Sequence, residues 1–375
     1  MYLYYQQFHL QQGSKGELVN MKKTFLKRKF NSNNILTFIT PIILIVFFIA
    51  FSLLSPVFLQ LNNLVNILSQ ISTLVLVAVG LSFVVASGGI DLSIAASYGL
   101  GAMVSILLLQ AQFNWFIAIF AAIITGIIIG SFNSLLILKG KITIFLATLG
   151  TLFIGESIER IVTTGGSPVY LPGMSPIFKF IGRGSVFVVQ QSGSARIDLK
   201  FSVIVALIVA ILAHILLSKT TFGRMLYAIG SQKEAAELSG VPVKRYTFYA
   251  FIICSITCSL AGIVGSSILT AYIPLSGRYY LMDAIGAVFI GSTLNKKGFP
   301  NIPGTLIGVL FFGIVSNGLN LIGISFYWQG VARGLLIFFI LVADAYKTKS
   351  SKKVNKVINY SIEQNPKHEN MKTQL

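Results

Sequence analysis

The sequence predicts an all-α, polytopic membrane protein with about ten transmembrane helices. Hydrophobic residues make up 54% of the 375 positions, charged residues only 11%, and the mean hydropathy is +0.80. These values lie outside the range of soluble domains. Apolar runs separated by short polar segments recur from residue 35 to residue 345, so most of the chain is expected within the membrane.

A helix needs about 20 apolar residues to cross a ~30 Å hydrocarbon core. The ten apolar runs cover residues 35–59, 64–86, 92–109, 113–138, 142–155, 201–217, 246–270, 281–293, 302–323 and 328–345. The fifth and eighth are short, which predicts tilted or partial crossings, or an extension of the fifth through Glu156, Glu159 and Arg160. We therefore expect a transmembrane domain over 35–345, with an outer loop at 156–200 and a cytoplasmic loop at 218–245.

The distribution of charge orients this domain. The net charge is +18, and most Lys and Arg residues fall in the N-terminal tail (1–34), the C-terminal tail (346–375) and alternate loops. This bias follows the positive-inside rule, so both termini are expected in the cytoplasm. The basic charge then reflects topology and attraction to anionic membrane lipid, and not nucleic-acid binding.

The first apolar run is too long for a signal peptide and lacks a cleavage site, which predicts an uncleaved anchor. Residues 1–20 contain no usable pattern, and Met21 is the more natural start of the protein.

The segment Ser87-Gly88-Gly89-Ile90-Asp91-Leu92-Ser93 separates two apolar runs. Its glycines release helical geometry, and Asp91 can cap the next helix by accepting from the backbone of Ser93 or Ile94. Irregular backbone at membrane depth is tolerated only where protein or water covers it. Two interpretations stay open: a cap at a tight turn, or a polar pathway lined by Gly88, Gly89, Asp91 and Ser93.

Later spans contain neutral polar residues that extend this candidate pathway: Asn133, Thr148, Asn317 and Asn320, accompanied by Ser134, Thr151 and Gln329. Such residues often form interhelical hydrogen bonds. A route lined by Asn, Ser and Thr also suits a hydroxyl-rich neutral solute better than an ion. Asp283 followed by Asn317 repeats the order of Asp91 and Asn133 at a different spacing, which suggests an internal repeat.

A short polar segment with its own helix signals lies between the sixth and seventh spans, at residues 220–242. Ser231 and Glu234 have the spacing of a capping box, and Gly240 followed by Pro242 predicts the helix end. About eight residues would form a rod of roughly 12 Å. So small a helix between two spans predicts a docking site for a cytoplasmic partner, formed by Ser231, Glu234, Ala235, Ala236, Leu238 and Gly240.

Features of an enzyme are missing from the sequence. It has no G-x-x-x-x-G-K-[S/T] motif and no soluble segment large enough for a nucleotide-binding domain. Cys254 and Cys258 share one face of the seventh span without His or carboxylate neighbours, so they are predicted to pack. We expect no catalytic residue, no metal site and no cofactor bound by this chain itself.

In this order, the motifs resemble the membrane permease subunit of bacterial ribose-type ABC sugar importers, in the branched-chain amino acid/ribose permease family. The resemblance covers roughly residues 62–345 and rests on 88–93, 133–151, 221–230, 234–241, 283–288 and 317–321. Two segments depart from the family pattern: the basic turn at 296–303 and a long outer loop through 188–196.

The resemblance implies a type II-like ABC importer permease in the bacterial cytoplasmic (inner) membrane. It implies a second permease copy as partner, ABC ATP-binding subunits that hold ATP and Mg, and an extracytoplasmic sugar-binding protein that delivers the solute. The segment 231–240 would be the coupling helix, seated in a groove of the ATP-binding subunit.

The sequence thus predicts a non-catalytic permease subunit for a neutral monosaccharide of the pentose or hexose type, driven by ATP hydrolysis on separate subunits. A permease for branched-chain amino acids or nucleosides shares the architecture, although residues 88–93 favour a sugar. An ion-coupled secondary transporter acting through Asp91 or Asp283 fits less well. The sequence predicts no paired charges within the membrane, and it predicts a loop helix that such a transporter does not need. A receptor or scaffold predicts no vectorial uptake.

Overall fold

A computed structural model describes residues 32–190, 196–295, 298–325, 327–336 and 338. The chain divides into two compact units, residues 44–338 and residues 1–43 with 339–375. The described part of the second unit is residues 32–43, which begin helix α2 (Ser32–Leu54). The predicted terminal tails, 1–34 and 346–375, therefore lie almost wholly outside the described residues.

Residues 44–338 are built mainly from helices. After α2, the first half contains α3 (Leu61–Ala86), α4 (Ile94–Gln110), α5 (Trp115–Leu138), α6 (Ile144–Val162) and α7 (Pro176–Arg183). The second half contains α8 (Phe201–Lys219), α9 (Thr221–Ser231), α10 (Lys233–Leu238), α11 (Val243–Leu269), α12 (Gly277–Thr293) and α13 (Ile302–Leu321). A further helical run covers residues 327–336.

Two small antiparallel sheets accompany the helices. Strand β1 (Val169–Tyr170) pairs with β4 (Ala271–Tyr272), with Val169 opposite Tyr272. Strands β2 (Ser185–Gln190) and β3 (Arg196–Lys200) form a hairpin with a register shift between Ser185 and Phe187. The predicted all-α membrane fold is confirmed, and these short strands are additions to it.

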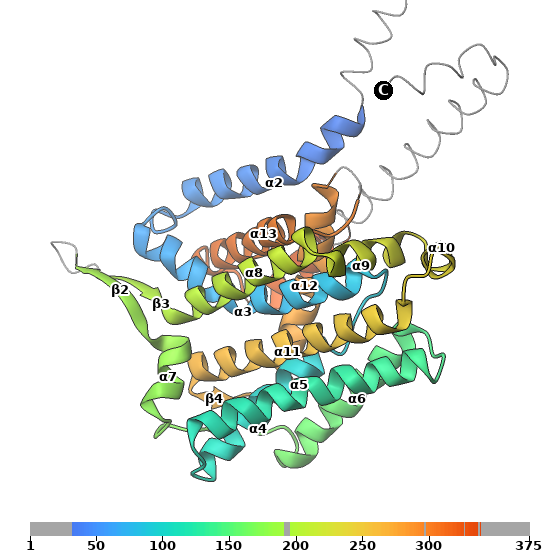
Figure 1. The fold of residues 1–375 in the computed structure, drawn as a ribbon. Coiled ribbons are helices and arrows are strands. Elements are labelled where there is room, and N and C mark those ends of the chain that lie inside the picture. The colour runs from blue at the N-terminus through green and yellow to red at the C-terminus, as the bar shows by residue number, and fades with distance from the viewer. Residues whose placement is uncertain (1–31, 191–195, 296–297, 326, 337, 339–375) are drawn as a thin grey trace, which may run out of the picture. The chain divides into compact units, whose positions relative to one another are not determined.

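Helix α3 is the centre of the bundle (Figure 1) and packs against α8, α11, α12 and α13. Most of α3 is buried within the chain, whereas only 28% of the apolar stretch of α5 and of α8 is buried. Helix α11 packs on α3, α4 and α5. A Cβ at Gly126 or Gly130 would lie 2.7 Å from Ser255 O or 2.8 Å from Phe251 O, so the predicted close packing at small residues is found between α5 and α11.

Helices occupy nine of the ten predicted apolar runs, and the tenth, 328–345, lies partly outside the described residues. Among the described helices, five are long and apolar enough to cross a membrane: α3, α5, α8, α11 and α13. The short fifth run does extend through Glu156, Glu159 and Arg160, because α6 continues to Val162. The short eighth run gains its missing length at its start, since α12 begins at Gly277.

The connections between helices gather at two ends of the bundle. Helix α8 follows the β2–β3 hairpin directly and leads into α9 and α10, so the hairpin and α10 lie at its opposite ends (Figure 1). This arrangement separates the predicted outer loop, 156–200, from the predicted cytoplasmic loop, 218–245. The two loops are therefore available to different partners.

Candidate functional site

The turn between α3 and α4 begins the candidate site. Gly88 has a φ of +88°, which a residue with a side chain rarely adopts. Asp91 then folds back on the chain, and its Oδ1 accepts from the Ser93 backbone N–H at 2.8 Å and from Ser93 Oγ at 2.6 Å. The predicted contact of Asp91 with the Ser93 backbone is present, but the N-cap of α4 is Ser93 and no side chain caps this helix, so Asp91 closes the turn before α4.

This turn is joined to two further helices by side-chain hydrogen bonds. Asn133 Nδ2 on α5 donates to Ser93 Oγ at 2.7 Å, and Thr151 Oγ1 on α6 donates to Asn133 Oδ1 at 2.6 Å. All four side chains of this Asp91 network are buried. The Ser93 hydroxyl donates to the carboxylate and accepts from the amide. The network fixes α4, α5 and α6 to one another.

The structure therefore brings together three of the predicted pathway residues, Asp91, Ser93 and Asn133. Thr151 completes the network although Thr148 was the predicted member of that pair. Thr148 Oγ1 instead donates to Ile144 O, one turn back on its own helix, at 2.9 Å. The sequence marked both threonines as polar residues within a span, and both are buried, but it did not show which of them meets Asn133.

The remaining predicted pathway residues have other partners. Asn317 and Asn63 exchange two hydrogen bonds, at 2.9 and 3.0 Å. Asn320 accepts from Gln329 Nε2 at 2.7 Å. These contacts connect α13 to α3 and to the last helical run. The role of all these residues in a pathway stays a prediction.

Asp283 shows that the suggested repeat does not extend to contacts. It pairs with Arg333, with Nη1 to Oδ2 at 3.1 Å, whereas Asp91 accepts from Ser93. The expectation that paired intramembrane charges are missing is wrong, because a mostly buried carboxylate on α12 meets a mostly buried guanidinium. A paired charge is the usual way to stabilise ionised groups in this environment.

The turn after α3 touches the end of α9 through backbone alone. A Cβ on Gly230 would lie 2.3 Å from Ala86 O, and a Cβ on Gly88 would lie 3.2 Å from Gly230 Cα. Only glycine fits at Gly230 without separating the two segments. The Asp91 turn and the loop that carries α10 are thus in direct contact.

Helix α9 is anchored by a tyrosine. Tyr227 Oη donates to Pro300 O at 2.8 Å, and burial raises the pKa of Tyr227 to about 12. The hydroxyl is therefore a protonated donor at neutral pH. The contact joins α9 to the turn before α13, within the segment 296–303 that departs from the family pattern.

Helix α10 differs from its prediction at the start and agrees at the end. It contains six residues, its N-cap is Gln232, and no side chain caps it, because Ser231 is the last residue of α9. The predicted capping box of Ser231 and Glu234 is therefore wrong. Gly240 has a φ of +82°, and Val241 N donates to Ala236 O at 3.0 Å. This is the hydrogen-bond pattern of a Schellman ending.

The loop helix presents most, and not all, of the predicted docking residues. Ser231, Glu234, Ala235, Leu238 and Gly240 are exposed, and Leu238 is 90% exposed despite its apolar side chain. Ala236 is the exception, because it is buried against Ile229 and Val243. Ala236 packs inside the loop and stabilises it. The expectation that its side chain faces a partner is therefore wrong.

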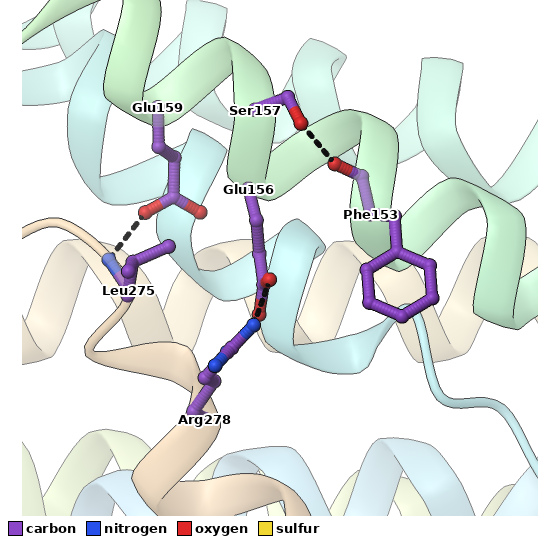
Figure 2. A network of polar contacts seen from close by, with 6 residues as sticks. All are labelled: Phe153, Glu156, Ser157, Glu159, Leu275 and Arg278. Atoms are coloured by element: carbon purple, nitrogen blue, oxygen red, sulfur yellow. Dashed lines mark hydrogen bonds and ion pairs between the residues drawn. The ribbon is translucent and has the colours of Figure 1, made fainter. Parts of the chain in front are cut away.

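Two carboxylates on α6, those of Glu156 and Glu159, hold the start of α12 (Figure 2). Glu159 Oε2 accepts from Tyr272 Oη and from the Leu275 backbone N–H, both at 2.7 Å. Glu156 forms a two-pronged ion pair with the Arg278 guanidinium. Glu156 is 5% and Glu159 1% exposed.

These contacts change the expected character of the outer loop. Both glutamates were expected at the start of the outer loop, 156–200, whereas they lie within α6 and bind the chain's own groups. The helix α6 brings them to one face because they are three residues apart. Their role is to position the β4–α12 connection, a function that a long-range contact defines and local sequence does not.

A protein family and several known proteins match most of this chain. A family model described as branched-chain amino acid transport system/permease component matches residues 63–341. The chain is 34% identical over 305 residues to the ribose import permease protein RbsC of Bacillus subtilis (strain 168), covering 81% of this chain and 91% of the relative.

Other relatives give the same picture. The chain is 34% identical over 308 residues to RbsC of Escherichia coli (strain K12), covering 82% of this chain and 92% of the relative. It is 32% identical over 308 residues to the galactose/methyl galactoside import permease protein MglC of Escherichia coli (strain K12), covering 78% and 89%. No solved structure gives a significant match.

Proposed function

Because the chain belongs to the family of branched-chain amino acid and ribose-type ABC permeases, we propose that it translocates a neutral monosaccharide as the membrane-spanning subunit of an ABC importer. The observation that carries the proposal is the exposed surface of α10, directly connected to a buried polar turn in the bundle. The chain itself is non-catalytic in this proposal, and ATP is hydrolysed on a separate subunit.

The partner on the cytoplasmic side is an ABC ATP-binding subunit docked on α10. Leu238 offers it an apolar side chain, and Glu234 and Ala235 complete the exposed face. An isolated leucine of this exposure on a helix of six residues is well explained by a partner's groove. ATP and Mg belong to that subunit.

Coupling passes through the contact between Gly230 and the Ala86–Gly88 turn. Movement of α9 and α10 changes this contact first, because no side chain lies between the two backbones. The turn leads through Asp91 and Ser93 to α4, α5 and α6. Nucleotide on the partner can drive transport only if the inward and outward states of this chain hold the ATP-binding subunits differently.

The remaining partners are assigned by orientation. The loop helix is placed in the cytoplasm of a bacterium, with both termini, and the β2–β3 hairpin on the outer side of the inner membrane. A sugar-binding protein delivers the solute there. A second permease copy and membrane lipid cover the exposed apolar faces of α5 and α8.

Two observations support a sugar as the solute: the names of the relatives, and the neutral polar side chains of the candidate pathway. The two most informative relatives are import permeases for ribose and for galactose or methyl galactoside. The family description names branched-chain amino acids, which remain the alternative together with nucleosides.

Uptake in cells tests the proposal. The chain would be expressed with its ATP-binding subunit and binding protein in bacteria that lack ribose and galactose importers. We expect saturable uptake of radiolabelled D-ribose or D-galactose that is lost when the partner's phosphate-binding lysine is replaced. Uptake should survive an uncoupler while glycolysis maintains ATP.

The alternatives predict different results in the same cells. Uptake of leucine or a nucleoside without sugar uptake would assign the other solutes. Uptake that an uncoupler abolishes, and that does not require the ATP-binding subunit, would identify an ion-coupled transporter. No uptake of any of these solutes by a correctly inserted complex would leave a receptor or scaffold.

A further inference from the structure

A large cavity opens at the hairpin end of the bundle. Its volume is about 1170 Å³, and it lies between α3, α7, α8, α11 and α12, with Ser185 of β2 and Lys200 of β3 at its edge. Ligand sites in proteins usually measure about 300–1,000 Å³. The cavity can therefore hold a small solute together with water. None of the predicted pathway residues lines it.

Helix α3 provides a polar stripe on one wall. Asn66, Ser69, Gln70 and Thr73 line the cavity at the i, i+3, i+4, i+7 spacing of one helix face. Elsewhere α3 is strongly apolar and buried. Within the described part of the chain, the side-chain amides of Asn66 and Gln70 form no hydrogen bond, and both residues are exposed. These two amides are thus available to a ligand, whereas Ser69 Oγ donates to Val65 O and Thr73 is buried.

The opposite walls add further hydrogen-bonding groups. Ser202 at the start of α8 lines the cavity and is fully buried. Its Oγ has no hydrogen-bond partner among the described residues, a costly state for a buried hydroxyl unless a ligand or water binds it. Tyr280 and Gly265 complete the inner wall. The missing side chain of Gly265 makes room for the Tyr98 hydroxyl, because a Cβ there would lie 2.0 Å from Tyr98 Oη.

Four charged side chains line the cavity on the side of α7 and the hairpin, and three of them are engaged by the protein. Lys200 Nζ donates to Asp198 Oδ2 at 2.5 Å, and Arg183 Nε donates to Ile268 O at 2.5 Å. Lys179 is a third cation on this side. The α3 wall carries no charge. A neutral solute with several hydroxyl groups fits amide and hydroxyl side chains, each of which can donate and accept.

We propose that this cavity binds the neutral, hydroxyl-rich solute itself, a free monosaccharide in transit between the binding protein and the interior of the permease. The proposal rests on the proposed function and adds the place where the solute first contacts this chain. Gln70 and Asn66 supply the directional contacts, and Ser202 supplies a hydroxyl from the facing helix. The excess volume means that water remains with the solute, which favours weak binding and release.

Protection from thiol labelling tests binding without transport. Leu269→Cys, at an exposed position on the α11 wall of the cavity and apart from the proposed contacts, would be made in a background in which Cys254 and Cys258 are replaced by alanine, and the purified full chain placed in lipid nanodiscs. We expect D-ribose or D-galactose to slow labelling by a polar maleimide several-fold. Gln110→Cys, at the exposed end of α4, is the matched control and should label at an unchanged rate.

Three results would overturn the assignment. One is an unchanged labelling rate at Leu269→Cys with both sugars. Another is equal slowing at Leu269→Cys and Gln110→Cys, which would mean a general effect of the sugar. The third is slowing that depends on anionic lipid in the nanodisc and not on sugar, since the cations beside the cavity would then hold a lipid headgroup.

Transport measurements separate this proposal from the function on which it rests. In the assembled importer, Gln70→Leu and Ser202→Ala should lower sugar uptake several-fold while ATP hydrolysis stimulated by the loaded binding protein continues. Gln110→Leu should transport normally. Wild-type uptake by Gln70→Leu and Ser202→Ala would remove the cavity from the pathway. Absence of sugar uptake by the wild-type importer would instead reject the proposed function.

Discussion

Gly230 is the residue at which the packing leaves least choice. A Cβ there would lie 2.3 Å from Ala86 O, so Gly230→Ala must push α9 away from the turn that follows α3. We expect an overpacking cost of about 1–3 kcal/mol and loss of most uptake with normal membrane insertion. Thermal unfolding in detergent and sugar uptake would measure the two effects. Gly150→Ala, with open space around the site, is the control, and equal uptake by both variants would contradict the prediction.

Asp91 allows the effect of its charge to be separated from its hydrogen bonds. Asn at this position keeps the Oδ1 that accepts from Ser93, whereas Ala removes both contacts. We expect Asp91→Asn to retain the wild-type melting temperature and most uptake. Asp91→Ala should lose about 0.5–2 kcal/mol and much of its uptake.

Melting curves and initial uptake rates of the two variants check this prediction. A well-folded Asp91→Asn protein without uptake would assign the negative charge itself to transport. Equal, near-normal uptake by both variants would contradict the structural role of the Asp91 contacts.

Single residues also show where sequence reasoning reaches its limit. The contact of Asp91 with the Ser93 backbone is local, and a turn motif predicts it. The bonds from Asn133 to Ser93 and from Asn317 to Asn63 depend on which helices are neighbours. Polar residues inside spans could be recognised from the sequence, but their partners could not.

At the scale of an element, two apolar residues of α10, two positions apart, differ in burial. Leu238 is exposed and Ala236 is buried against Ile229 and Val243. Leu238→Asp should leave the melting temperature unchanged and lower co-purification of the ATP-binding subunit and uptake several-fold. Ala236→Asp should destabilise the loop, since a charge would be buried without a partner.

The comparison of these two variants is the measurement. Their melting temperatures, recovery of the ATP-binding subunit and uptake would be determined at equal expression. Wild-type recovery and uptake with Leu238→Asp would remove α10 from the proposed interface. A stable Ala236→Asp protein would contradict the burial of Ala236.

The end of α10 was predictable and its start was not, for a physical reason. Gly240 is needed at a positive φ and is a strong local signal. The capping-box spacing of Ser231 and Glu234 was misleading because α9 continues through Ser231, which is therefore already helical. An N-cap residue has non-helical backbone angles, and Gln232 occupies that position for α10.

At the scale of the whole molecule, the inferences depend on the side of the membrane that each end faces. Single cysteines at Ser192, outside the described residues, and at Ser231, which is exposed, would be introduced without Cys254 and Cys258. We expect an impermeant maleimide to label intact cells at Ser192→Cys and not at Ser231→Cys, because the charge bias places 218–245 inside.

Permeabilised cells provide the control, in which both cysteines should react. Labelling of intact cells at Ser231→Cys and not at Ser192→Cys would invert the topology. The proposed contact of α10 with a cytoplasmic ATP-binding subunit would then be untenable.

The fold class and the positions of most spans could be predicted because hydrophobic length determines them. The structure of the outer loop could not, since β1 pairs with β4 about 100 residues away and Glu156 binds Arg278 across a similar separation. The cavity next to the hairpin depends on five helices at once. The periodicity of apolar residues indicates which face of a single helix is buried. It does not indicate how several helices enclose a cavity.

The unequal burial of α3 and α8 has a mechanical consequence. At 1.5 Å per residue, the 19 residues of α8 span about 28 Å and the 26 of α3 about 39 Å. Exposed α8 therefore just matches a ~30 Å hydrocarbon layer, while α3 is shielded by its neighbours. A thicker bilayer would pull on α8 first, and α8 leads directly into α9 and α10. Hydrophobic mismatch would thus act on the loop helix before it reached the centre of the bundle.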